Sequence, residues 1–498
     1  MKILVISWFV LLIPARSYGQ QLPTLTKAQM RADFDTLAAA LIRINPHDFV
    51  RRRVNRYSQT DSILALRPAI DTITSTPSFF WLVDKALTFC QDGHTSVVDK
   101  RFYPFLDSTD RARTNAAAPD TAIVQAYARL YAARLAAYKL KLPLKYIAGK
   151  YVVLKNFTYR GTTIPAKYVL TACDKTTIHA YVRRNIGNLK DLHWDFANQR
   201  FYTENFTQSL GRRPIDRLGL TFVGGGRSIT RAFRLNEGVT LTAPLKYAQP
   251  RVPAVRYLAR YEALYLRMPV MRDAAYYLPK IDSLTRGRPL KKVILDVRDN
   301  PGGSDPEWQA ILRHLIDRPI VLRITSCANR QNPRPDRLGT PAAPAAYQNK
   351  FFDTAGAYQL VARAPDTLTV DAGSIHFKGP IHVLQNENCF SSAGSLISTC
   401  QFSDQLINVG NSTGWFAGFG SMPWVGLLPN SRILYWTEPY LDFTNARQPA
   451  DLFHNDVKIP VPLSAEEYAA KYSYAGDWYS PEYLLKYDKV FRHVLGLK

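Results

Sequence analysis

Two loops, each placed between an apolar strand pattern and a helix pattern, constrain this chain most. The first is L-D-V-R-D-N-P-G-G at residues 295–303, and the second is N-E-N-C-F-S-S-A-G-S at residues 386–395. The runs K-V-I-L-D-V and I-H-V-L-Q before them are typical of buried strands, and the patterns at residues 306–316 and 392–402 predict amphipathic helices. Strands that alternate with helices indicate an α/β fold.

The residues of these loops suit acyl transfer. A Gly-Gly pair at a strand end allows backbone N–H groups to point at a ligand, because glycine adopts conformations that other residues avoid. A serine at the start of a helix lies in the positive field of the helix N-terminus. Together the two loops predict a serine nucleophile that faces an oxyanion hole.

A third motif, D-G-H-T at residues 92–95, lies upstream of both loops. With the N-P-G-G turn and the S-A-G-S loop, it resembles peptidase family S41, which contains the tail-specific (carboxyl-terminal processing) proteases and the tricorn-like proteases. The resemblance covers about residues 92 to 462 and implies an α/β catalytic core of crotonase-like β-β-α units. The chain departs from the family at Ser395, which replaces the usual acid of the serine motif.

The resemblance assigns the nucleophile to Ser392, the first residue of S-A-G-S, with the neighbouring Ser391 as the alternative. One branch of the family uses a lysine downstream of the serine as the base. No lysine occurs between Lys378 and Lys458, so that branch does not fit. The tricorn-like branch uses an upstream histidine as the base, and His94 in D-G-H-T lies at the corresponding position. An unperturbed imidazole, with a pKa of about 6.5, suits this task near neutral pH.

A third catalytic group should hold the imidazole tautomer. The tricorn-like branch uses a glutamate after the serine, and Glu438, at the end of the apolar run in Y-W-T-E-P, is our choice. Asp442 and Asp456 compete for this role. His454, in a polar loop, remains a minor alternative to His94 as the base.

The expected oxyanion donors are backbone N–H groups of Ala393, which follows the nucleophile, and of Gly302 or Gly303. The P-G-G sequence alone also fits an ordinary tight turn, and its position after a buried strand favours the functional interpretation. Cys389, three residues before Ser392, is better explained as a small packed hydrophobe than as a nucleophile.

The remaining segments predict the domain organisation. Residues 1–19 combine Lys2, an apolar run and small residues before Gln20, as in a signal peptide. The run is about half of the roughly 20 residues that a membrane span needs. We expect a signal peptide (1–19), a helical N-terminal domain ending in D-G-H-T (20–104), a helical connector (105–144), a candidate degenerate PDZ-like domain (145–215), the catalytic domain (216–465) and a C-terminal helical tail (466–498).

The composition excludes several classes of protein. The net charge of +24 comes from Arg and Lys scattered along the chain, and no basic run is interleaved with aromatics as in a nucleic-acid module, so we expect no nucleic-acid partner. The five cysteines form no C-x-x-C pair, so neither a zinc site nor a disulfide framework is expected, and no other metal or cofactor is implied. The mature protein should be exported, periplasmic or extracellular, without stable membrane insertion.

We therefore expect a secreted serine-type peptidase that acts on peptides or unfolded proteins through an acyl-enzyme. The alternative is a catalytically silent protein on the same fold that binds peptides or lipids, an option that Ser395 keeps open. An α/β-hydrolase esterase would need a G-x-S-x-G elbow, which neither Ser391 nor Ser392 satisfies. A PDZ-like domain would hold the end of a peptide along a sheet edge.

Overall fold

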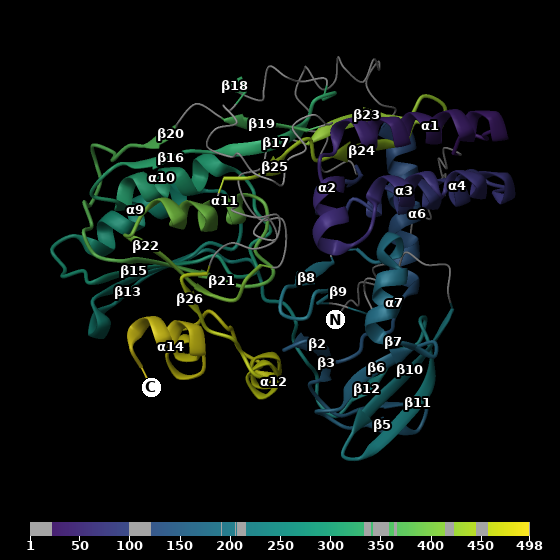
Figure 1. The fold of residues 1–498 in the computed structure, drawn as a ribbon. Helices are drawn as coiled ribbons and strands as arrows, with labels where there is room; N and C mark the ends of the chain where they lie inside the picture. The colour runs from purple at the N-terminus through teal and green to yellow at the C-terminus, as the bar shows by residue number, and fades with distance from the viewer. Residues whose placement is uncertain are drawn as a thin grey trace, which may run out of the picture.

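The computed structural model describes residues 22–98, 121–190, 192–204, 206, 216–332, 340–341, 358–362, 366–413, 423–444 and 457–497. Three units make up the molecule: a helical N-terminal unit, a β-sheet unit and an α/β core (Figure 1). The expected signal peptide and residues 105–120 of the expected connector lie outside the described residues. Within these residues, no helix is both long and apolar enough to cross a membrane.

The helical unit contains α1 (Lys27–Ile44), α2 (Asp48–Val50), α3 (Gln59–Leu64) and α4 (Thr76–Thr88). α1 begins at a capping box, in which the Thr26 side chain accepts from the Gln29 N–H and the Gln29 side chain accepts from the Thr26 N–H. Residues three and four apart on α1 and α4 are buried against each other, which confirms the amphipathic pattern. This unit ends in the D-G-H-T loop.

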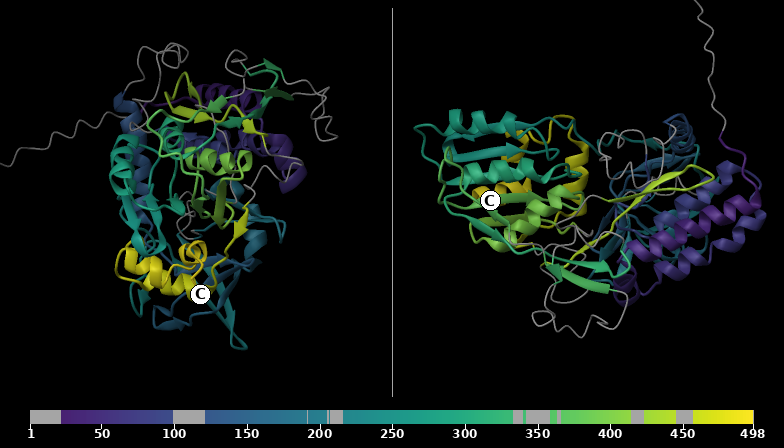
Figure 2. Two further views of the ribbon diagram at one scale, coloured as in Figure 1. Left: turned by 90° about the vertical axis from the view of Figure 1, so that its left-hand side faces the viewer. Right: turned by 90° about the horizontal axis from the view of Figure 1, so that it is seen from above.

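A small antiparallel sheet joins the helical unit to a hairpin from the far end of the chain. β1 (Ser96–Val97) pairs with β24 (Leu434–Thr437), which pairs with β23 (Trp424–Leu427). The two residues Ile433 and Tyr435 are buried in the same apolar cluster as α1 and α4. In the view from above, the hairpin reaches from the α/β core toward the helical unit (Figure 2).

The β-sheet unit is an antiparallel sheet in the order β11-β10-β6-β3-β2, covered by α7 (Ile178–Arg184). Its strands are β2 (Leu144–Ile147), β3 (Lys150–Val153), β6 (Val169–Cys173), β10 (Arg217–Gly224) and β11 (Arg227–Arg234). The hairpin between β10 and β11 turns at Gly225 and Gly226, both with positive φ. The expected domain boundary after residue 215 is wrong, because β10 pairs with β6 and so belongs to this sheet.

The α/β core contains a sheet in the order β13-β14-β15-β21-β22-β26, parallel from β14 onward. Its strands are β13 (Ala254–Leu258), β14 (Ala263–Arg267), β15 (Lys292–Asp296), β21 (Ile381–Gln385), β22 (Leu406–Gly410) and β26 (Ile459–Pro460). Both faces are buried, as parallel sheets require. The expected α/β class is confirmed.

Helices cover the two faces of this sheet. α9 (Ala274–Thr285), α10 (Asp305–Leu315) and α11 (Ser392–Thr399) pack on one face, against side chains such as Leu295 and Val383. α14 (Lys489–Leu495) packs on the other face, against Ile294 and Leu384. Alternate residues of each strand therefore supply the two apolar layers. With α12 (Ala465–Ser473) and α13 (Pro481–Lys486), α14 forms the expected helical tail.

Candidate active site

The two loops predicted from the sequence lie side by side. β15 and β21 are parallel neighbours, with Leu295 opposite Val383, so their carboxyl ends meet at one edge of the sheet. Asp299 and Asn386 then exchange two hydrogen bonds, from the Asp299 N–H to Asn386 Oδ1 (2.9 Å) and from Asn386 Nδ2 to Asp299 Oδ1 (2.8 Å). These bonds lock the N-P-G-G turn against the serine loop.

Ser391 occupies a strained turn between β21 and α11. Its φ of 54° and ψ of −125° are unusual for a residue with a side chain. Such strain persists only where the surroundings hold it, and it is common at functional sites. Gly302, with φ of +103°, leaves room for this turn, since a Cβ built on it would lie 2.6 Å from Ser391 Cβ. The turn presents the Ser391 side chain outside α11, whose first residue is Ser392.

Three side chains from distant parts of the chain form one hydrogen-bonded series. Ser391 Oγ lies 3.2 Å from His94 Nε2, and His94 Nδ1 lies 2.7 Å from Glu438 Oε2. Because a carboxylate only accepts, Nδ1 must donate to Glu438, which leaves Nε2 of the neutral ring to accept the Ser391 proton. This is the order of donors and acceptors that activates a serine.

Pairing of β1 with β24 brings His94 and Glu438 together. His94 precedes β1 and Glu438 follows β24, and Ser96 lies opposite Trp436. The buried Asp92 carboxylate holds the D-G-H-T loop in shape, because it accepts from the His94 N–H (3.0 Å) and from the Thr95 N–H (2.6 Å). These bonds fix the backbone that carries the His94 imidazole.

The surroundings of His94 favour its charged form. Burial alone would lower its pKa, but the hydrogen bond and negative charge of Glu438 and the charge of Asp92 outweigh burial, so the pKa of His94 is raised above 6.5. The imidazole ring also packs on Phe390, with ring centroids 4.7 Å apart. An imidazolium formed during a reaction would therefore be stabilised where it arises.

The hydrogen-bonded series does not include Ser392, the serine expected from the sequence to be the nucleophile. Ser392 is 4% exposed, and its Oγ has no hydrogen-bond partner among the described residues. Ser391, and not Ser392, donates its hydroxyl to His94 Nε2, because the helix begins at Ser392 and turns the Ser392 side chain into the protein interior. The backbone strain at Ser391 is the feature that separates the two serines, and no sequence pattern reveals it.

Two of the expected oxyanion donors already have acceptors within the protein. The Gly302 N–H donates to Asn300 Oδ1 (2.8 Å), and the Ala393 N–H donates to Phe390 O (3.1 Å). Among the described residues, the N–H groups of Gly303 and Ser392 donate to no protein acceptor. A Cβ on Gly302 would lie only 3.0 Å from Ser392 N, so the glycine turn and the start of α11 approach closely.

The competing residues lie elsewhere or are engaged. Asp442 accepts from the Thr444 N–H (3.0 Å), and His454 and Asp456 lie outside the described residues. Burial raises the pKa of Cys389 to about 12, and its Sγ donates to Val297 O (3.1 Å). This agrees with a packed side chain. The described residues contain no cluster of His, Cys, Asp and Glu that could hold a metal ion.

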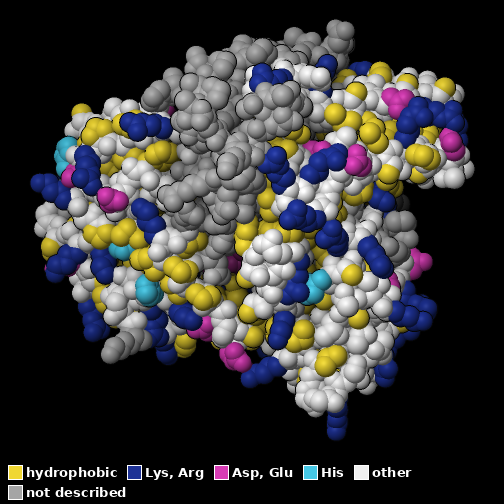
Figure 3. Space-filling model, in the orientation of Figure 1, with side chains coloured by type: hydrophobic (Ala, Val, Ile, Leu, Met, Phe, Trp, Pro, Cys, Tyr) yellow, Lys and Arg dark blue, Asp and Glu magenta, His cyan; other side chains and the backbone are white. Residues whose placement is uncertain are grey.

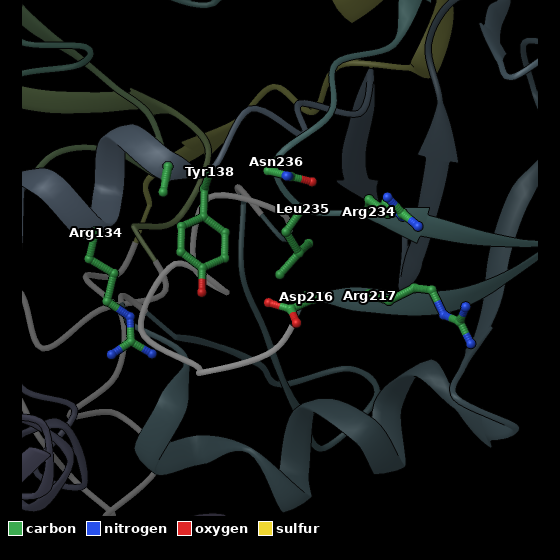
Figure 4. Close-up of a pocket in the computed structure, with 8 residues that line it drawn as sticks. Arg134, Tyr138, Asp216, Arg217, Arg234, Leu235 and Asn236 are labelled. Carbon is green, nitrogen blue, oxygen red and sulfur yellow. The ribbon is translucent and has the colours of Figure 1, made fainter.

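A cavity of about 810 Å³ lies away from this site, beside α6 (Thr121–Ala137) and β10–β11. It is lined by Tyr138, Asp216 and three arginines (Figure 4). Two of these arginines already have partners, since Arg134 stacks on Trp81 at 4.1 Å and Arg234 lies 3.9 Å from Glu237. None of the residues predicted from the sequence to be catalytic lines it.

Comparisons with known proteins agree with this picture. Residues 262–448 match the sequence profile described as Peptidase family S41. Two structures of CPAF align with 94% of this chain: mature CPAF (14% identity, TM-score 0.56, 98% of its chain) and mature CPAF complexed with lactacystin (13% identity, TM-score 0.54, 99% of its chain). No curated protein sequence matches significantly.

At these identities the structural likeness shows a fold shared over nearly the whole chain. The S41 profile spans the segment that carries both loops, Ser391 and Glu438. Residues 262–448 match peptidase family S41, as the motifs had indicated, and peptides or proteins are the substrates that this family implies.

Proposed function

We propose that this protein is a serine peptidase of the histidine-dependent, tricorn-like kind, with Ser391 as nucleophile, His94 as general base and Glu438 as the group that orients His94. The series of hydrogen bonds from Ser391 through His94 to Glu438 carries this proposal. An S41 enzyme that relies on lysine would need a base that residues 379–457 do not contain.

In the proposed reaction, Ser391 Oγ attacks the peptide carbonyl carbon while its proton passes to His94 Nε2. The oxyanion that forms is bound by the N–H groups of Gly303 and Ser392, and each such donor contributes about 2.7–4 kcal/mol to transition-state stabilisation. His94 then gives the proton to the leaving amine, and an acyl-enzyme ester on Ser391 remains. Water, deprotonated by His94, hydrolyses this ester.

The same proposal extends to the rest of the chain. The core is taken as crotonase-like, and the β-sheet unit as a PDZ-like domain that presents peptide substrates. Residues 1–19 are proposed to direct export, so the enzyme would act outside the cytoplasm. On the face shown in Figure 3, Lys and Arg side chains are spread over the described surface and form no single dominant patch.

A fluorophosphonate probe tests the proposal, because only an activated serine reacts with it. We expect the wild-type protein to be labelled, Ser391→Ala to lose labelling, and peptide hydrolysis to fall by roughly 10⁶-fold. Ser392→Ala is the matched control: it removes an unpartnered buried hydroxyl but keeps the backbone N–H, so labelling should persist.

Two outcomes would overturn this assignment. Loss of labelling in Ser392→Ala but not in Ser391→Ala would return the nucleophile to Ser392. A correctly folded wild-type protein that reacts with no probe and cleaves no peptide would instead indicate the silent binding protein.

A further inference from the structure

A buried cluster of charges lies beside the serine loop but outside the proposed catalytic series. Lys145, on β2 of the β-sheet unit, forms ion pairs with Glu387 and Glu204. The side chains of Lys145, Glu387 and Glu204 are only 5%, 7% and 9% exposed. Groups of this kind are rarely buried unless they are paired, so the cluster needs a structural or functional reason.

Glu387 is the member that belongs to the serine loop, four residues before Ser391. Its carboxylate also accepts from the Tyr468 hydroxyl (3.2 Å) and from Asn411 Nδ2 (3.4 Å). The Lys145 ammonium lies 4.7 Å from the centre of the Tyr468 ring. The Glu387 carboxylate, at the upstream end of the serine loop, is thus held by side chains from three places: β2, the end of β22 and helix α12.

The pair of Lys145 and Glu387 is charged at neutral pH. Burial alone would raise the pKa of Glu387, but the ammonium of Lys145 outweighs burial and lowers that pKa to about 2. Burial would likewise lower the pKa of Lys145, but the charges of Glu204 and Glu387 raise it well above its ordinary value. Loss of Lys145 would leave two buried carboxylates without their cation, whereas loss of Glu387 would leave Lys145 paired with Glu204 alone.

This anchor matters because the turn that follows it is strained. Ser391 holds a backbone conformation with φ of 54°, which relaxes unless its surroundings determine it. Downstream, α11 holds the turn through the bond from the Ser395 N–H to Ser391 O (3.0 Å). Upstream, groups of the α/β core hold the loop through the bond of Asn386 to Asp299 and through the Phe390 N–H, which donates to Asn300 O (3.0 Å). Lys145, which is paired with Glu387, holds the loop from another unit.

We propose that Lys145 and Glu387 are a positioning pair, through which the β-sheet unit holds the Ser391 turn in its reactive conformation. The inference rests on the proposed function, since it assigns a role toward the same serine. It gives the β-sheet unit a task beyond the presentation of substrate. Neither residue would touch the substrate, so their loss should lower kcat and leave KM largely unchanged.

Two substitutions test the pair: Glu387→Gln, which keeps the shape and removes the charge, and Lys145→Met, which keeps the length of the side chain. We expect each folded variant to lose about 10²-fold in kcat and in the rate of fluorophosphonate labelling, the effect of a displacement of about 1 Å at a reacting group. KM for a peptide substrate should change by less than about twofold, because the substitutions remove no contact that the enzyme makes with the bound substrate. The double variant should be no worse than Lys145→Met alone, because Lys145→Met already removes the pair of Lys145 and Glu387.

Tyr146→Phe is the matched control. Tyr146 neighbours Lys145 on β2, but its hydroxyl donates to Asp195 (2.6 Å) within the β-sheet unit and, among the described residues, forms no hydrogen bond with the serine loop. It should therefore keep wild-type kcat even if it loses stability. Lys145→Arg, which retains the charge, should recover part of the rate that Lys145→Met loses.

The possible results separate the two proposals. If the wild-type protein is not labelled, the proposed function fails. If the wild-type protein is labelled and folded Glu387→Gln keeps its kcat and labelling rate, the positioning role alone is overturned. A rise in KM at constant kcat would also overturn it, because the cluster would then act on substrate binding. Should Lys145→Met fail to fold, Glu387→Gln still decides the question.

Discussion

At the scale of single residues, the charges around His94 determine the pH at which the serine is active. Glu438 and Asp92 raise the pKa of His94, and the base must be neutral to accept a proton. Activity should therefore fall on acidification, with a midpoint above the unperturbed value of about 6.5. Asp92→Asn removes one of the two negative charges, so the midpoint of kcat/KM should move to lower pH. A pH–rate profile for a peptide substrate measures both midpoints, and a midpoint that stays in place or rises would contradict this account.

At the scale of secondary-structure elements, one buried arginine joins the end of β15 to the start of α14. Arg298 donates to Asp296 (2.6 Å) and to Asp488 (2.6 Å), and Asp488 also caps α14 by accepting from the Phe491 N–H (2.9 Å). Asp488→Ala removes the cap and leaves part of the arginine charge unpaired. We expect a loss of about 3–5 kcal/mol in the free energy of unfolding, measured by urea denaturation.

The control at this scale is Ser480→Ala, which removes the cap of α13 but touches no buried charge. Ser480 accepts from the Tyr483 N–H (3.2 Å), and its loss should cost about 1 kcal/mol. Equal losses for the two variants would show that the cap, and not the ion pair, accounts for the effect of Asp488.

Elements with a local signal were predictable. The apolar runs predicted β15 and β21, and periodicity predicted α10 to within one residue, because burial on both faces of a strand or on one stripe of a helix is visible in the sequence. The sheet to which β10 belongs was not predictable, since its partner β6 lies more than 40 residues upstream and local pattern does not encode that pairing.

The predicted contact of His94 with Glu438 agrees with the structure, but it came from resemblance to a family and not from periodicity. Ser391 and Ser392 differ in backbone conformation. Because both are serines and adjacent in the chain, the sequence alone does not show this difference.

At the scale of the whole molecule, the proposed site is complete only when the helical unit docks on the β23–β24 hairpin. His94 comes from the first 98 residues, whereas Ser391 and Glu438 lie beyond residue 390. The docking buries Ile433 and Tyr435 of the hairpin among side chains of α1 and α4, and β1 completes the hairpin's sheet. Family similarity covers residues 262–448, so the segment that matches the family lacks the base.

This division predicts the behaviour of a split chain. Residues 121–498 expressed alone should fail to react with a fluorophosphonate and should aggregate, because the apolar face of the hairpin is then exposed to water. Co-expression with residues 22–98 should restore a soluble complex and the labelling of Ser391, since the buried contacts and the pairing of β1 with β24 do not require the chain to be continuous. The same co-expression with His94→Ala in the short fragment should restore solubility without labelling. Labelling of the long fragment alone would show that the base lies outside the helical unit, and His94 would then lose its proposed role.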